Sequence, residues 1–242
     1  MENNQLLVSL QNITKIYGIH KVLDNVSFDL RKGEIHCLVG ENGAGKSTLI
    51  KILSGAISPE SGNLYIAGKK ITSMTPRKAI ELGISTVYQD AELVESLTVT
   101  DNIFLGDEKS ASLPFIIDKK IQFQKAQEII NTLHMNLPVD SLVEELSVSQ
   151  KQMLEIVKAL YRDSKIIIMD EPTSSLGLEE KKALMKIIQN LKQRGIGIIY
   201  ISHYLEEIFM IGDRVTILKD GKLVNTYKVA SVDIETVIRG MV

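Results

Sequence analysis

A run of eight residues, Gly40-Glu41-Asn42-Gly43-Ala44-Gly45-Lys46-Ser47, constrains the fold of this chain more than any other feature. An apolar segment, residues 35–39, precedes it, and helical spacing follows from Ser47 to Ala56, so the run is predicted to join a strand to a helix. Glycines let consecutive backbone N–H groups face phosphate oxygens, Lys46 adds a positive charge, and the Ser47 hydroxyl can ligate Mg²⁺. The pattern predicts a site for ATP and Mg²⁺, which includes the adjacent Thr48.

A second apolar segment, residues 166–169, ends in two acidic residues, Asp170 and Glu171. A buried strand followed by a solvated turn would look the same in isolation. With a phosphate loop elsewhere in the chain, we interpret Asp170 as contacting Mg²⁺ through water and Glu171 as polarising the attacking water. Adjacent side chains on a strand point in different directions, which permits two roles.

Strand-like and helical segments alternate along most of the chain. Residues 165–169 and 196–201 each precede a helical segment, 178–194 and 204–211, which predicts a mostly parallel sheet in an α/β fold. Further strands are expected at 6–11 and 22–30, and Asp220-Gly221 predicts a tight hairpin between 214–219 and 222–227.

Residues 92–162 are mostly helical in pattern, and an apolar stripe is formed by Phe123, Ala126, Ile130 and Leu133. We interpret this part as an inserted helical subdomain, with residues 106–114 as its least ordered loop. The prediction is therefore one domain, with an ATP-binding core at 1–91 and 163–242.

Composition narrows the classes of protein that remain. The formal net charge of −2 lacks the basic excess that would attract nucleic acid, and no apolar run approaches the roughly 20 residues of a membrane span. The polar start lacks the pattern of a signal peptide. Cys37, the single cysteine, lies in an apolar run and is interpreted as a buried core thiol, which permits a reducing compartment.

The motifs occur in the same order, and over essentially the whole chain, as in the nucleotide-binding domain of ATP-binding cassette (ABC) transporters, which the sequence therefore resembles. The resemblance implies a P-loop NTPase core with an N-terminal antiparallel β subdomain. It also implies that Gln89 contacts Mg²⁺ and the attacking water, that Tyr17 stacks on adenine, and that His203 touches the γ-phosphate.

The segment Leu146-Ser147-Val148-Ser149-Gln150 resembles the family's signature, Leu-Ser-Gly-Gly-Gln, so that Ser147, Ser149 and Gln150 are implied to contact ATP on an opposite subunit. Ser147 as a plain helix N-cap is the alternative. Val148 and Ser149 replace glycines, so the backbone there must avoid angles that only glycine adopts. Gly177 stands where the family usually has an aspartate that links the two sites of a dimer.

The sequence is most similar to ATPases of monosaccharide importers of the ribose, galactose and xylose type, which usually carry two fused cassettes. We therefore hypothesise the N-terminal cassette of a longer protein, an ATP hydrolase on the cytoplasmic, inner face of the membrane. The implied partners are membrane permease subunits, a second cassette in a homodimer or fused C-terminally, and indirectly an extracytoplasmic solute-binding protein, with no nucleic acid. Two alternatives stay open: a soluble cassette ATPase of translation or DNA repair, and a regulatory module that binds ATP without hydrolysing it.

Overall fold

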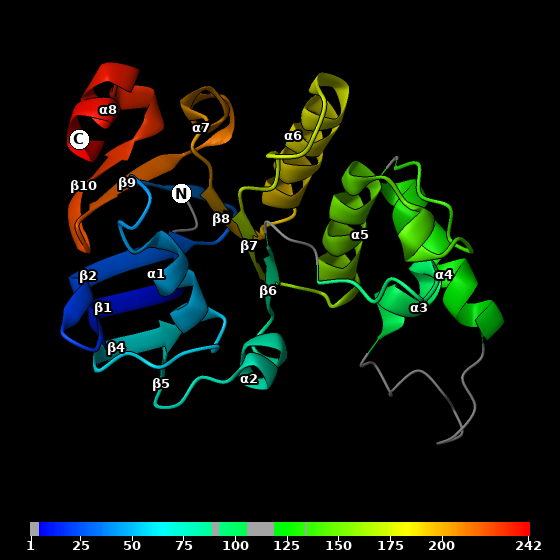
Figure 1. Cartoon of the computed structure of the whole chain (residues 1–242), viewed down its shortest axis with the longest axis horizontal. Coiled ribbons are helices and arrows are strands. Elements are labelled where there is room, and N and C mark those ends of the chain that lie inside the picture. Colours follow the sequence, from blue (N-terminus) through cyan, green and yellow to red (C-terminus); the bar gives the residue numbers. More distant parts are fainter. Residues whose placement is uncertain (1–4, 89–91, 106–118, 134) are drawn as a thin grey trace.

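The computed structural model describes residues 5–88, 92–105, 119–133 and 135–242 (Figure 1). Two sheets organise this part of the chain. The larger has six strands in the order β10-β9-β3-β8-β7-β6. Its members are β3 (Ile35–Val39), β6 (Ile84–Val87), β7 (Ile166–Asp170), β8 (Gly197–Ile201), β9 (Arg214–Lys219) and β10 (Lys222–Lys228).

All neighbouring strands of this sheet are parallel except β10 and β9, the first pair in this order. The parallel sheet is buried on both faces, which is why β3 and β8 are fully buried, apolar strands. The expected hairpin is present: Asp220 and Gly221 connect β9 to β10 with φ angles of 48° and 73°. The mostly parallel α/β sheet predicted from the sequence is confirmed.

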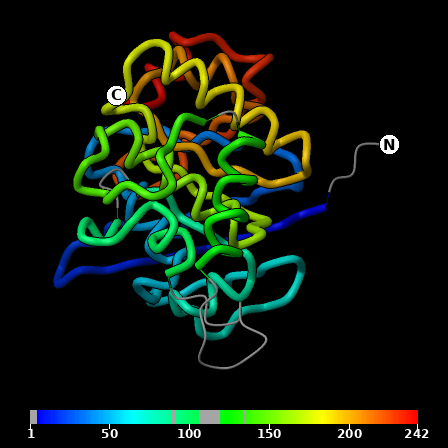
Figure 2. Tube along the Cα trace, turned by 90° about the vertical axis from the view of Figure 1, so that its right-hand side faces the viewer, coloured from blue at the N-terminus to red at the C-terminus, as the bar shows by residue number. Residues whose placement is uncertain are grey.

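The smaller sheet is antiparallel, with four strands in the order β2-β1-β4-β5. Its strands are β1 (Leu6–Tyr17), β2 (His20–Arg31), β4 (Ser61–Ile66) and β5 (Lys69–Ile71). The expectation of strands at 6–11 and 22–30 was too short, because the β1–β2 ladder continues to Tyr17 and His20. The turn between them projects from the body of the molecule (Figure 2).

The helices divide between the two faces of the parallel sheet and a separate group. Helix α1 (Lys46–Leu53) packs between the two sheets, in a core shared with β1, β2 and β4. The opposite face of the parallel sheet is covered by α6 (Leu178–Gln193), α7 (Leu205–Ile211) and α8 (Ile234–Met241). Helix α2 (Pro76–Glu81) and two short 3₁₀ turns, Val143–Glu145 and Val229–Ser231, complete the connections.

Helices α3 (Val99–Phe104), α4 (Lys119–Thr132) and α5 (Val148–Tyr161) pack on one another, away from the antiparallel sheet (Figure 1). Ala126, Ile130 and Leu133 are buried there, as expected. Phe123, in the same stripe, is 41% exposed. It lies at the edge of the stripe, and Gln122 is buried instead. The expected loop 106–114 lies outside the described residues.

Alternation along β3 distributes its side chains between the two cores. Leu38 faces the core that contains α1, whereas Ile35, Cys37 and Val39 face the core on the other side. Cys37 is fully buried, and burial raises the pKa of its thiol, in agreement with a core role. Within the described residues, no helix combines the length and apolar character needed to span a bilayer.

Candidate functional site

The phosphate loop connects the carboxyl end of β3 to the first turn of α1. Gly45, the N-cap of α1, has a φ of 106°, and a Cβ there would lie 2.8 Å from the carbonyl oxygen of Val22. The loop is also supported by the β9–β10 hairpin, because the Gly221 amide donates to the Ala44 carbonyl at 3.1 Å. Only glycine fits at position 45, since it tolerates both the positive φ and the close approach of β2.

Lys46 folds back across this loop. Its Nζ donates to the carbonyl oxygens of Gly40 at 2.7 Å and Glu41 at 3.0 Å. Burial lowers the pKa of the Lys46 ammonium, and the charges of Glu171 and Asp170 oppose that shift. The lysine is therefore held over the loop, and both carboxylates act on its charge.

A cavity of about 230 Å³ brings the loop and the end of β7 together. The lining residues are Val22, Asn42, Gly43, Gly45, Lys46, Ser47, Thr48, Asp170 and Glu171. Gly40, Glu41 and Ala44 belong to the same loop but do not line this cavity, and the Ala44 side chain is buried. Val22 on β2 was not anticipated, because an apolar residue in a strand carries no signal of a ligand site.

The two carboxylates differ in their surroundings. Burial raises the pKa of Asp170, the charge of Glu171 raises it further, and Lys46 and Lys51 oppose the shift. Glu171 adopts a φ of 49°, and its amide donates to the Ile201 carbonyl at 2.9 Å. A left-handed conformation in a residue other than glycine is strained by about 1–3 kcal/mol and is common at functional sites.

His203 follows β8, the strand next to β7. Its Nδ1 lies 3.3 Å from Glu171 Oε1, and its ring stands 4.0 Å from that of Tyr204, centroid to centroid. The carboxyl ends of three neighbouring strands therefore carry the phosphate loop, the two carboxylates and the imidazole.

Tyr17 ends β1 and pairs with His20 across the hairpin. It is 46% exposed, and Lys15 Nζ lies 5.2 Å from its ring centroid. Tyr17 is not part of the cavity lining, but its hairpin partner strand contributes Val22 to that lining. Gln89 lies outside the described residues.

Ser147 is the N-cap of α5, which agrees with the alternative interpretation of this residue. Its hydroxyl accepts from the Gln150 amide at 3.2 Å, and its own amide donates to Gln150 Oε1 at 3.0 Å. The helix begins at Val148, and neither Val148 nor Ser149 has a positive φ. Replacing the family's glycines by these residues therefore imposes no backbone strain. Ser147, Ser149 and Gln150 do not line the cavity of about 230 Å³ beside α1.

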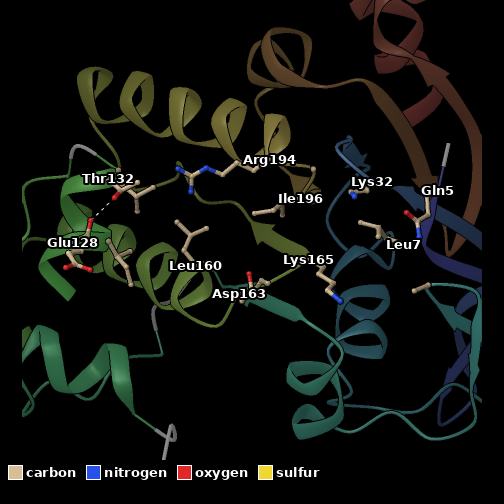
Figure 3. Close-up of a pocket in the computed structure, with 15 residues that line it drawn as sticks. Gln5, Leu7, Lys32, Glu128, Thr132, Leu160, Asp163, Lys165, Arg194 and Ile196 are labelled. Atoms are coloured by element: carbon tan, nitrogen blue, oxygen red, sulfur yellow. Dashed lines mark hydrogen bonds between the residues drawn. The ribbon is translucent and has the colours of Figure 1, made fainter. Parts of the chain in front are cut away.

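A larger cavity, of about 710 Å³, lies at the amino ends of the strands, opposite the phosphate loop (Figure 3). Lys165 and Ile196 in its wall precede β7 and β8, whereas the phosphate loop follows β3. The cations Lys32, Lys165 and Arg194 point in different directions around it. Ligands of parallel α/β sheets bind at the carboxyl ends of the strands, so this cavity is not the nucleotide site.

Comparison with known proteins shows which sequences and folds this chain is similar to. A family model described as "ABC transporter" matches residues 23–174. A putative ribose/galactose/methyl galactoside import ATP-binding protein of Agrobacterium fabrum is 44% identical over 98% of this chain and 46% of its own length. A galactose/methyl galactoside import ATP-binding protein of Clostridium perfringens is 43% identical over 100% of this chain and 47% of its own length. The chain thus spans about half the length of these curated relatives.

Solved structures agree with the fold. A nucleotide-free ATP-binding cassette from an ABC transporter superposes with a TM-score of 0.84 at 27% identity, covering 98% of this chain and 99% of the other. A cassette solved in its ADP conformation gives 0.85 at 26% identity, covering 97% and 98%. A dimeric cassette in a post-hydrolysis state, bound to ADP and Pi, gives 0.81 at 25% identity, covering 92% and 98%.

Proposed function

The chain belongs to the ABC transporter family, and we propose that it is the ATP-binding and ATP-hydrolysing cassette of an importer for a monosaccharide or a related small solute. One observation carries the proposal: the phosphate loop, Asp170 and Glu171 line one cavity, and His203 lies 3.3 Å from Glu171. The import of sugars is supported by what the relatives' names state about those proteins.

The cavity residues fit a nucleoside triphosphate. Gly43 and Gly45 leave the backbone of the loop open to phosphate oxygens at the N-terminus of α1, where N–H groups have no partner within the helix. Lys46 Nζ now donates to two loop carbonyls, and a phosphate in the cavity would be a stronger, charged acceptor. Tyr17, at the exposed end of the β1–β2 hairpin, is proposed to stack on the adenine.

The donor set also fits Mg²⁺. This ion is usually held by one or two carboxylates together with phosphate oxygens and waters, not by a cage of protein ligands. Ser47 and Asp170 line the cavity, and no cluster of three or more His, Cys, Asp or Glu occurs among the described residues. When bound, Mg²⁺ would neutralise charge on the phosphates.

The remaining side chains would carry out the hydrolytic step. We propose that Glu171 orients a water molecule and accepts its proton, because Glu171 lines the cavity and its backbone is fixed by Ile201. His203 would contact the γ-phosphate from the end of β8, beside Glu171. Gln89 is proposed to contact Mg²⁺ and the same water.

Ser147, Ser149 and Gln150 stand at the N-terminus of α5, outside the cavity. We propose that they complete the ATP site of a second cassette, in a homodimer or in a fused chain. The proposed partner in the membrane is a permease that receives solute from an extracytoplasmic binding protein. The cassette would then work at the cytoplasmic face of that membrane.

The test is titration of the chain with Mg·ATP, compared with Lys46→Ala. Loss of a charge-assisted contact predicts an affinity lower by about tenfold or more in the variant. Lys78→Ala is the matched control, because Lys78 is a lysine of helix α2 that lies outside the cavity lining, and the affinity of this variant for Mg·ATP should stay within about twofold of wild type. No specific uptake of Mg·ATP by the wild type would refute the proposal.

Transport is tested separately. A purified permease of a monosaccharide importer should bind the chain and stimulate its ATP hydrolysis. Binding to ribosomes or DNA, with none to the permease, would favour a soluble ATPase of translation or repair instead.

A further inference from the structure

A buried carboxylate, that of Glu207 in α7, lies behind the proposed catalytic residues and has no part in the function described so far. Glu207 is only 8% exposed. Its Oε2 accepts hydrogen bonds from Thr173 Oγ1 at 2.9 Å, Tyr200 OH at 2.8 Å and Ser202 Oγ at 2.9 Å. A buried carboxylate is costly unless it is paired or hydrogen-bonded, so these donors determine where it can lie.

The donors come from the segments that carry the proposed site. Thr173 is two residues after Glu171, and Ser202 directly precedes His203. Tyr200 belongs to β8, and α7 follows that strand at its carboxyl end (Figure 1). One oxygen atom of Glu207 therefore connects the segment after β7 to the segment after β8.

The chain on both sides of His203 is fixed by this network. Ser202 Oγ donates to Glu207 and also accepts from the Tyr204 amide at 3.0 Å. The Glu207 amide in turn donates to the Tyr204 carbonyl at 3.1 Å. Both neighbours of His203 in the sequence, Ser202 and Tyr204, are therefore hydrogen-bonded to Glu207.

The other carboxylate oxygen faces a cation. Lys181 Nζ of α6 lies 3.5 Å from Glu207 Oε1 and 4.3 Å from the centroid of the Tyr204 ring. This contact supports the negative charge of Glu207 and the position of Tyr204, the residue after His203. Burial, together with the charge and hydrogen bond of Glu207, raises the pKa of Tyr200, so that its hydroxyl stays a donor.

We propose that Glu207 is a positioning residue for ATP hydrolysis: it holds His203 beside Glu171 by anchoring the turn that contains the imidazole to the segment that follows the β7 carboxylates. It does so without touching the nucleotide, since neither Glu207 nor any of its three hydroxyl donors lines the phosphate cavity. The role of Glu207 in hydrolysis rests on the proposed function, whereas its effect on the position of His203 does not.

The test variant is Glu207→Gln, which keeps the volume of the side chain and removes its charge. The amide oxygen is a weaker acceptor for three donors, and the new NH₂ group faces a cation or a hydroxyl. We expect kcat for ATP hydrolysis to fall by about tenfold, while the Kd of Mg·ATP stays within about twofold of wild type. Equal losses in kcat and in affinity would overturn the proposal.

A double-mutant cycle separates positioning from general destabilisation. In a His203→Ala background there is no imidazole to position, so Glu207→Gln should lower the single-turnover rate by less than about twofold. The same tenfold loss in both backgrounds would show that Glu207 does not act through His203.

Glu155→Gln is the matched control, because Glu155 is also a buried glutamate but is paired with Lys158 in α5. Its kcat is expected to stay within about twofold of wild type. A tenfold loss there as well would mean that any buried charge change lowers the rate, and would overturn the assignment to Glu207.

A crystal structure of Glu207→Gln gives a measurement that does not depend on turnover. We expect the distance between His203 Nδ1 and Glu171 Oε1 to exceed its present 3.3 Å by about 1 Å or more, or the imidazole to lose its single position. An unchanged distance would overturn the proposal even if the wild type proved not to hydrolyse ATP. Should Glu207→Gln fail to fold, Ser202→Ala is measured in the same way, because it removes the donor nearest His203.

Discussion

His203 Nδ1 and Glu171 Oε1 lie 3.3 Å apart, although the two residues belong to the ends of different strands. Because β7 and β8 are parallel neighbours, with Asp170 paired to Ile201, the residues that follow both strands lie together at the carboxyl ends of the strands. The Glu171 amide donates to the Ile201 carbonyl and holds Glu171 in its left-handed conformation. Glu171 therefore faces both the imidazole and the phosphate cavity from a fixed backbone.

Replacement of Glu171 by glutamine should abolish ATP turnover and leave ATP binding intact. The change keeps the shape of the side chain but removes the carboxylate that would accept a proton from water, and general bases contribute about 100-fold or more. Steady-state hydrolysis and Mg·ATP titration of the same preparation are the measurements.

Glu179→Gln is a suitable control for this variant, because Glu179 is an exposed acid in the first turn of α6 and does not line the cavity. Its rate should equal that of the wild type. If Glu171→Gln hydrolyses ATP at the wild-type rate, Glu171 is not the base.

Tyr17→Ala should weaken ATP binding through loss of stacking on the adenine. Stacking of a base on an aromatic ring contributes about 1–3 kcal/mol, which corresponds to an increase in Kd of about fivefold or more. Tyr17→Phe keeps the ring and should bind ATP within about twofold of wild type. Calorimetry with ATP and with inorganic tripolyphosphate distinguishes the base from the phosphates, and an equal loss for both ligands would contradict the role in stacking.

Features determined by local sequence were predicted well. The phosphate loop and the hairpin at Asp220-Gly221 depend on backbone angles that only a few residue types accept, so their glycines identify them. The position of the two carboxylates at the end of β7 could be predicted because an apolar segment leads to them directly. The order of the strands was not predicted, since it depends on pairing between segments as distant as β3 and β8.

The features that were missed depend on distant contacts. Glu207 follows Glu206 in the first turn of a helix, where acids are often solvated. Its burial is explained by contacts outside that helix, with the donors Thr173, Tyr200 and Ser202 and the cation Lys181. Phe123 fits the helical period as well as its buried neighbours do, but it lies at the edge of the stripe and remains exposed. Strands β4 and β5 are short segments held by pairing to β1 and to each other.

Gly45→Ala should destabilise the chain more than Gly43→Ala. Both glycines have positive φ, 106° and 86°, and a left-handed residue with a Cβ costs about 1–2 kcal/mol at either position. At Gly45 the new Cβ would also meet the Val22 carbonyl oxygen at 2.8 Å, whereas at Gly43 no atom lies within 4 Å. Urea unfolding should show an additional loss of at least about 1 kcal/mol for Gly45→Ala. Equal losses would mean that β2 moves away at no cost.

His36 is a buried histidine on β3. Its Nδ1 donates to the Asp29 carbonyl at 2.6 Å, because that oxygen can only accept, so Nε2 accepts from Thr216 Oγ1 at 2.7 Å in the neutral ring. Burial and, to a lesser extent, the charge of Arg214 lower the pKa of His36 to about 4, although Glu34 and Asp29 oppose the shift. The folded state therefore favours the neutral imidazole.

Stability should fall as the pH drops from about 6.5 to about 4, because in this window the unfolded chain binds a proton at His36 that the folded chain does not. Above this window the contribution of His36 is fully present, and across it about 3 kcal/mol is lost, with a slope of up to about 1.4 kcal/mol per pH unit. His36→Asn keeps a donor near Asp29 but does not titrate. Urea unfolding of both chains at several pH values between 7 and 4 isolates this slope from that of the carboxylates, which both chains share. The variant is expected to be less stable at pH 7, and its stability should fall less steeply with decreasing pH, by up to about 1.4 kcal/mol per pH unit. Parallel curves would show that His36 binds its proton over the same pH range in the folded and the unfolded chain.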